Sequence, residues 1–316
     1  MRRYVIRRLL QALPLLVGIS IVTFCIIQLA PGDPATLMIN PEASLEDVRR
    51  LKIALGLDKP VYVQYWRWIS RVLRGDLGTS FIDGYPVAAK MLQRIPTTLQ
   101  LVGLALLVQV SLAIPVGIIC ATRQYSVFDY AASSFAFLGI SLPNFWFGLM
   151  LMLLFSVYLG ILPSHGLSTY GVGFNLGDRL RHLAMPVLVM GLTGMASFTR
   201  YTRSSLLEVV RQDYIRTARA KGLSERVVIY KHALRNSLIP VVTLLGLSLP
   251  TLFGGSLIVE SLFAIPGMAR LAVQAVFQRD YPVIMAVNMM AATMVVAGNL
   301  LADIAYALVD PRIKYD

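Results

Sequence analysis

The feature that most constrains this chain is a series of apolar runs that are almost free of charge and long enough to cross a lipid bilayer. The first run extends from Leu9 to Ala30, and at ~1.5 Å per residue it spans the ~30 Å hydrocarbon core. Five more runs lie near 97–121, 133–159, 184–200, 237–259 and 283–309. Because a backbone in lipid must satisfy its hydrogen bonds internally, each run predicts a helix. The sequence therefore predicts an all-α, polytopic membrane protein with about six transmembrane helices.

The first run is predicted to be a retained transmembrane helix rather than a cleaved signal peptide. A signal peptide has an apolar region of only ~7–15 residues, which is shorter than this run. The run ends in Pro31-Gly-Asp-Pro34, without a cleavage site of small residues.

The distribution of Lys and Arg predicts the orientation in the membrane. With the N-terminus inside, the cytoplasmic segments are 1–8, 122–132, 201–236 and 310–316, and together with the boundary residue Arg200 they hold sixteen Lys and Arg. The two short external loops hold four, so the positive-inside rule places both termini in the cytoplasm. Cytoplasmic flanks thus explain much of the net charge of +12, and no nucleic-acid partner is expected.

The long segment 31–96 after the first predicted helix is expected to form an extracytoplasmic helical cap. Ser44 and Asp47 have capping-box spacing, and Gly56 lies where a helix would end. The segment could simply pack on the membrane helices, or it could be a docking surface for an extracytoplasmic partner. These two interpretations are compatible.

Two further helices are predicted in the same segment. Pro60 can open one whose apolar face contains Val61, Tyr65, Trp68 and Val72, and a third could run from Pro86 to a stop at Pro96. Trp66 and Trp68 are typical of a membrane interface.

The segment 201–236 reads as a helix, a glycine break and a second helix. Gly222 can adopt positive φ and end the first helix, and Ser224 can cap the second. An apolar stripe is formed by Leu206, Val209, Val210, Ile215 and Ala218. An ordinary basic loop would explain the Arg residues but not an amphipathic pair of helices hinged on glycine. Such a pair suits insertion into a groove on another protein.

This segment carries a resemblance to a known family. The run Asp213-Tyr-Ile-Arg-Thr-Ala-Arg-Ala-Lys-Gly222, followed by His232-Ala-Leu-Arg-Asn236, resembles the coupling loop of ABC-importer permeases of the dipeptide/oligopeptide (peptide/nickel) branch. Against the general loop consensus of Glu-Ala-Ala, three residues, Gly and later Ile-x-Leu-Pro, the chain keeps Ala218, Gly222 and Leu234. It departs at Arg216, Thr217, His232 and Arg235, and these departures agree with the peptide branch.

Further segments in the same order extend the resemblance nearly end to end. They are Pro31-Gly-Asp-Pro34, Gly75-Asp-Leu-Gly78, Arg94-Ile-Pro-Thr-Thr-Leu99, Glu260-Ser-Leu-Phe-Ala-Ile-Pro-Gly267, Arg279-Asp-Tyr-Pro282 and Asp310-Pro-Arg312. The long external segment is similar to that of one of the two permeases in such systems, rather than to its shorter-looped partner.

The resemblance implies a type I ABC-importer permease fold, with a flank and first helix over 1–30, the cap over 31–96 and a permease core over 97–316. It implies a bacterial inner-membrane location, a homologous second permease, two ATPases on the cytoplasmic face and an extracytoplasmic binding protein. The implied substrates are di- or oligopeptides, with glutathione, nickel chelates or sugars as alternatives. The implied ATPase-coupling residues are Asp213, Thr217, Ala218, Ala220, Lys221, Gly222, Leu223, Ser224, His232 and Leu234.

Catalytic and metal-binding motifs are absent from the sequence. It contains no G-x-x-x-x-G-K-[S/T] loop, so ATP and Mg are expected on partner subunits, and the chain itself is predicted to bind no cofactor and not to be an enzyme. His165 and His182 are too few for a metal site. A stand-alone secondary transporter would need inverted repeats, and an intramembrane enzyme would need a catalytic pair at membrane depth.

One acid in the last apolar run is unusual. Asp303 lies four residues after Asn299, on one helical face, and Asn288 falls near that face. These residues are candidates for a translocation path, since acids in membranes tend to face a bundle interior or a cavity. The alternative is a buried polar tie to a neighbouring helix.

Overall fold

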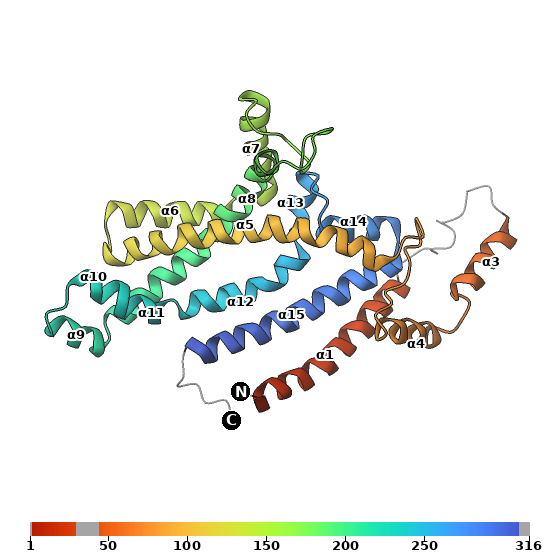
Figure 1. Ribbon diagram of the computed structural model, residues 1–316, viewed down its shortest axis with the longest axis horizontal. Helices are drawn as coiled ribbons and strands as arrows, with labels where there is room; N and C mark the ends of the chain where they lie inside the picture. The colour runs from red at the N-terminus through yellow and green to blue at the C-terminus, as the bar shows by residue number, and fades with distance from the viewer. Residues whose placement is uncertain (1, 30–43, 310–316) are drawn as a thin grey trace. The chain divides into compact units, whose positions relative to one another are not determined.

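The computed structural model describes residues 2–29 and 44–309, and this part of the chain is dominated by helices (Figure 1). Its helices divide into two compact units. Unit 1 comprises the chain up to Thr97 together with Gly267–Val296, and unit 2 comprises Thr98–Pro266 and the chain from Ala297. Each unit is described by itself below.

Five helices are long and apolar enough to cross a membrane, and a bent pair of helices makes a sixth span if it is counted as one. The five are Leu10–Leu29, Val87–Thr122, Leu176–Val210, Ile239–Leu262 and Tyr281–Leu301, and the pair is Val127–Gly139 with Asn144–Tyr158. The prediction of about six transmembrane helices is confirmed.

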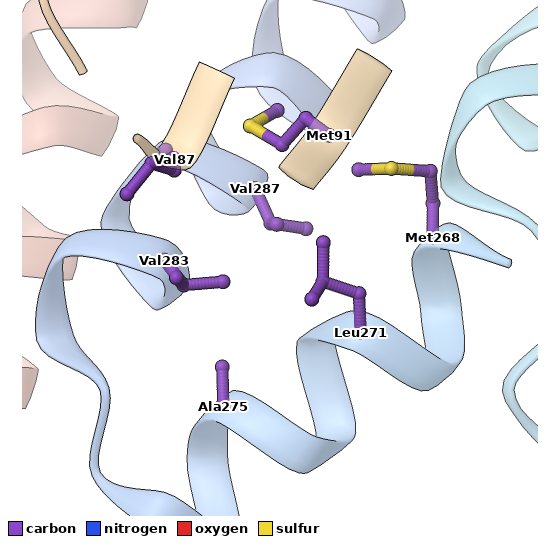
Figure 2. Close-up of a cluster of buried hydrophobic side chains, with 8 residues drawn as sticks. Val87, Met91, Met268, Leu271, Ala275, Val283 and Val287 are labelled. Atoms are coloured by element: carbon purple, nitrogen blue, oxygen red, sulfur yellow. The ribbon is translucent and has the colours of Figure 1, made fainter. Parts of the chain in front are cut away.

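Unit 1 packs the extramembrane helices against the ends of membrane spans. It contains α1 (Arg2–Leu29), α3 (Leu45–Leu55), α4 (Val61–Val72), α14 (Met268–Gln278), the start of α5 (Val87–Thr122) and most of α15 (Tyr281–Val309). Figure 2 shows its main core, in which α5, α14 and α15 meet. The buried side chains there are Val87, Met91, Met268, Leu271, Ala275, Val283, Ala286 and Val287.

The predicted start and end of the first cap helix are confirmed. Ser44 and Asp47 form a reciprocal capping box at the start of α3, and Gly56 ends that helix in the left-handed conformation, at φ 71°. Pro60 stands at the N-cap position of α4. Trp66 is exposed, whereas Trp68 is buried against Phe24 and Tyr65 and helps to form the packing between α1 and α4. The expectation that the two tryptophans lie at a membrane interface stays a prediction.

The expected helix stop at Pro96 is wrong, because α5 continues through Pro96 without a break from Val87 to Thr122. The proline removes one backbone hydrogen bond from the helix. Packing on both sides compensates: Ile95 contacts the core of unit 1, and Thr97 and Thr98 are buried.

Unit 2 holds the remaining helices. They are α6 (Val127–Ser141), α7 (Asn144–Leu151), η1 (Met152–Tyr158, a π-helix), α8 (Leu176–Val210), α9 (Asp213–Ala220), α10 (Glu225–Val227), η2 (Val228–Ala233, a π-helix), α11 (Leu234–Ser237), α12 (Ile239–Gly254) and α13 (Leu257–Leu262). Its largest buried side chains include Leu101, Met185, Phe263 and Ile265.

The third apolar run is not the continuous helix that the sequence predicts over 133–159. The helices on either side of Leu142-Pro143 are bent by 102°. Leu142 is extended (φ −79°, ψ 126°), the conformation favoured before a proline, and Pro143 cannot donate a backbone hydrogen bond.

Glycines bring α5 and α8 into close contact along the core of unit 2. A Cβ at Gly194 would overlap the Gln109 side chain, and one at Gly117 would lie 2.6 Å from the Cβ of Thr202. Small residues at such crossings let two membrane helices approach closely, so dispersion contacts can hold them together.

Candidate functional site

The first part of the candidate site is an elbow, defined here as residues 211–237, which joins α8 to α12 (Figure 1). At its centre, Gly222 follows the C-cap residue of α9, Lys221, and has a φ of +78°. The Gly222 N–H donates to the Arg219 carbonyl at 2.9 Å, and the Leu223 N–H donates to the Ala218 carbonyl at 3.4 Å. These two bonds form a Schellman motif, which satisfies carbonyls at the helix end. The positive φ predicted for Gly222 is confirmed.

The inner side of the elbow is apolar and packed. Ile215 and Ala218 of α9 are buried against Leu206 of α8 and against Val228 and Ala233 of the following helix, and Val209 and Val210 are half-buried beside them. The predicted stripe therefore holds the elbow on the end of α8. That helix extends to Val210, ten residues beyond the predicted end of the fourth apolar run.

The second arm of the elbow is a helix with a π-helical stretch. Ser224 occupies its N-cap position with extended backbone, as predicted, but its side chain makes no capping hydrogen bond. From Glu225 the chain passes through the π-helical turns of η2 into α11. π-Helical turns are frequent at functional sites.

The structure separates the coupling residues predicted from the sequence into two groups. Ala218 is buried, and His232 and Leu234 are half-buried, so these three belong mainly to the inner packing. The exposed group is Asp213, Thr217, Ala220, Lys221, Gly222, Leu223 and Ser224. Only the exposed group can contact a partner without rearrangement of the elbow.

Two contacts across the elbow were not anticipated from the sequence. The Arg219 guanidinium donates to both carboxylate oxygens of Glu225, at 2.7 and 3.1 Å, and so bridges α9 and α10 over Gly222. The Asn236 amide donates to the Tyr214 hydroxyl at 2.8 Å. In the sequence, Arg219 and Glu225 are opposite charges on either side of Gly222. Their spacing of six residues predicts no contact within a single helix, so the ion pair could not be anticipated from helical periodicity.

The ion pair fixes the charges of both partners. Its hydrogen bond lowers the pKa of the Glu225 carboxyl and raises the pKa of the Arg219 guanidinium, because each charged form is stabilised by the other. Apolar groups stand beside this pair in solvent: Leu223 is 40% exposed and Tyr230 57% exposed. A clamped turn with exposed apolar side chains is suited to docking in a groove.

The second part of the candidate site is a groove of about 540 Å³ in unit 2, called here the polar groove. It is lined by α5, α8 and α12 and by both sides of the bend at Pro143. Its polar lining residues are Gln109, Asn144, Thr193, Ser197, Ser248, Thr251 and Ser256, and none of its lining residues is charged. The hydroxyl protons of Thr193 and Ser248 are donated to carbonyls of their own helices, at 2.8 and 2.7 Å, so the oxygens can still accept.

The polar groove does not include the path residues proposed from the sequence. Asn288 and Asn299 are exposed on α15, and neither lines the groove. The prediction for Asp303 concerns a side chain outside the described residues. The sequence did contain an indication of the groove. In the fourth apolar run, 184–200, the small and polar residues Thr193, Gly194 and Ser197 interrupt the apolar pattern.

A helical core with five apolar spans, or six if the bent pair counts as one, defines a polytopic membrane protein. The chain belongs to the family of binding-protein-dependent transport system inner membrane components, whose model matches residues 113–315. The model of the N-terminal part of such membrane components matches residues 1–102. The chain is thus a permease subunit of an ABC importer.

Relatives and a solved structure agree with this family. The chain is 48% identical to the oligopeptide transport system permease protein AppB of Bacillus subtilis (strain 168), over 100% of both chains. It is 40% identical to the dipeptide transport system permease protein DppB of Alkalihalophilus pseudofirmus, also over 100% of both. A chain of the MetNI methionine ABC transporter has a similar fold, with a TM-score of 0.54 at 20% identity over 70% of this chain and 96% of that one.

Proposed function

We propose that this chain forms half of a translocation pathway for di- or oligopeptides in an ATP-driven importer. The observation that carries the proposal is the elbow: a glycine turn, clamped by Arg219 and Glu225, that exposes Leu223 and Lys221 beyond the membrane helices. Relatives named as oligopeptide and dipeptide permeases support the peptide substrate. The same machinery could carry glutathione, nickel chelates or sugars, because a binding protein would select the substrate.

The proposed assembly assigns a side of the membrane to each part. The elbow lies in the basic cytoplasmic segment 201–236 and is gripped by one of two ATPases, which bind the ATP and Mg. Segment 31–96 lies outside, where an extracytoplasmic binding protein delivers substrate, and both termini are cytoplasmic. ATP-driven closure of the ATPases moves the elbow and reorients the helices, which gives alternating access.

The polar groove is proposed as this chain's share of the pathway, facing a homologous second permease over the core 97–316. A lining of neutral amides and hydroxyls suits peptide backbones, because hydrogen bonds to N–H and C=O do not depend on the side chains of the peptide. Asn288, Asn299 and Asp303 on α15 remain candidates for another part of the path.

The proposal is tested by transport in proteoliposomes that contain both permeases, the ATPases and the binding protein encoded beside them. Uptake of a labelled tripeptide should require ATP and the binding protein, and competition with glutathione, chelated nickel or a sugar should be weak. The control is the same complex with ATPases that cannot hydrolyse ATP. ATP-independent uptake would indicate a secondary transporter. Preferential uptake of a competitor would show that the competitor, and not a peptide, is the substrate.

A further inference from the structure

Unit 1 contains a hollow of about 290 Å³, called here the arginine hollow, which neither the elbow nor the polar groove uses. It is lined by α1, α4, the turn after α3, the segment 76–81 and the start of α15. Its apolar side is aromatic and comes from Phe24, Trp68, Phe81 and Tyr281. The rings of Phe24 and Trp68 stack with centroids 6.0 Å apart, which gives the hollow a firm wall.

Two guanidiniums line the same hollow. Arg67 and Arg71 are four residues apart on α4, hence on one face of that helix, and both are exposed. Within the described residues neither has a carboxylate in ion-pair distance. Asp76 also lines the hollow, and its carboxylate accepts a bond from the Gly78 N–H at 2.8 Å, so the lining holds two cationic side chains and one anionic side chain. Like charges in this spacing repel, so a bound anion would stabilise the pair.

The arginine hollow is lined by residues at the ends of two apolar spans. Phe24, Ile27 and Gln28 belong to the last two turns of the span Leu10–Leu29, and Met285 belongs to the first turns of the span Tyr281–Leu301. The headgroup layer begins where such spans end. Aromatic rings beside basic groups are typical of protein surfaces at that depth.

We propose that the arginine hollow binds the headgroup of an anionic phospholipid. The guanidiniums of Arg67 and Arg71 would donate to phosphate oxygens, for which their planar donor geometry is suited. The aromatic wall would contact the glycerol and the start of the acyl chains. At about 290 Å³ the hollow is at the small end of ligand sites, which suits one headgroup rather than an extended peptide. This inference goes beyond the transport function and does not depend on the substrate.

The test is native mass spectrometry of the intact importer complex, titrated in detergent with phosphatidylglycerol and, separately, with phosphatidylcholine that carries the same acyl chains. The variant is R67Q/R71Q, and the matched control is R49Q/R74Q, which removes two exposed charges from the same segment but none from the hollow. We expect tight phosphatidylglycerol binding to weaken at least tenfold in R67Q/R71Q, since the loss of a single charge-assisted bond of about 1.5 kcal/mol already costs that much. R67K/R71K should retain part of it.

Three results would overturn the proposal. One is unchanged phosphatidylglycerol binding in R67Q/R71Q, and another is an equal loss in R49Q/R74Q, which would indicate general charge attraction. The third is displacement of the bound lipid by a tripeptide, but not by its C-terminal amide, which would assign the hollow to a substrate carboxylate. Size-exclusion profiles and thermal unfolding of both double variants confirm that the complexes stay assembled.

Discussion

Two bends in unit 2 turn on a glycine with positive φ, yet their surroundings differ. Gly255, between α12 and α13, has φ 71° and ψ −167°, and a Cβ there would overlap the carboxylate of the fully buried Glu260 and lie 3.1 Å from a methyl of Thr98. Gly222 has φ +78°, and a Cβ there would meet no atom of the chain within 4 Å. Packing within the chain explains the first glycine. At Gly222 the positive φ alone favours glycine. The space around this residue is not filled by the chain and is therefore accessible to a partner.

The largest effect is expected at the packed bend. Gly255→Ala puts a side chain in a backbone region that is essentially restricted to glycine, at roughly 1–3 kcal/mol, and overpacks the site at a further cost of roughly 1–3 kcal/mol. The variant should be recovered in low yield and unfold at a lower temperature in detergent. Gly254→Ala is the control, since that position has ordinary φ and no neighbour within 4 Å. Equal stability of the two variants would contradict the packed bend.

The next effect concerns an ion pair at a third bend, between α5 and α6, in which Asp129 is buried and Arg203 is partly exposed. Asp129 accepts two bonds from Arg203 at 2.8 Å and one from the Tyr125 N–H at 3.0 Å, and its side chain is 4% exposed. Asp129→Ala should lower the free energy of unfolding by about 2 kcal/mol, because it leaves the partly buried Arg203 charge without its partner.

The matched control is Asp213→Ala, which removes a carboxylate that is 94% exposed and pairs with Arg216 at 3.4 Å. A surface pair of this kind contributes at most about 1 kcal/mol. Thermal unfolding of the two variants side by side measures the difference. A larger loss at Asp213 than at Asp129 would contradict the burial argument.

At the open elbow the effect on stability is smaller and the effect on transport larger. Gly222→Leu should cost about 1–2 kcal/mol through its positive φ alone, so the protein should insert and assemble its helices. The side chain would project into the proposed ATPase groove and should uncouple ATP hydrolysis from uptake. Leu223→Ala, which removes apolar surface without backbone strain, is expected to be milder. Wild-type uptake per ATP in Gly222→Leu vesicles would refute a coupling role for the elbow.

The smallest effect is expected from the clamp over that elbow. Glu225→Gln removes an exposed ion pair and should change stability by less than about 1 kcal/mol. Because the pKa of Glu225 is lowered in the folded chain, its stabilising contribution is present above the ordinary carboxyl pKa and is lost as the pH falls through the lowered value. Unfolding temperature followed from neutral to acidic pH should thus converge for wild type and Glu225→Gln. The charge-swapped Arg219→Glu/Glu225→Arg variant should restore the neutral-pH value.

Two of the prolines, Pro96 and Pro143, show the limit of prediction from sequence. Pro96 and Pro143 both interrupt apolar segments, and a local rule treats them alike. Yet α5 continues through Pro96, whereas the chain bends by 102° around Pro143. Neighbours decide the outcome: residues beside Pro96 are buried in tertiary packing, while Leu142 adopts the extended conformation that a proline favours in the residue before it.

The sequence by itself determined the membrane spans, the capping box at Ser44 and the glycine elbow at Gly222, because hydropathy, backbone hydrogen bonding and positive φ are local properties. Tertiary structure decided which polar groups face one another. The Arg219–Glu225 clamp, the polar groove around Gln109 and the arginine hollow each combine residues from separate helices or turns. Such contacts depend on how those elements pack, and no local pattern in the chain specifies that packing.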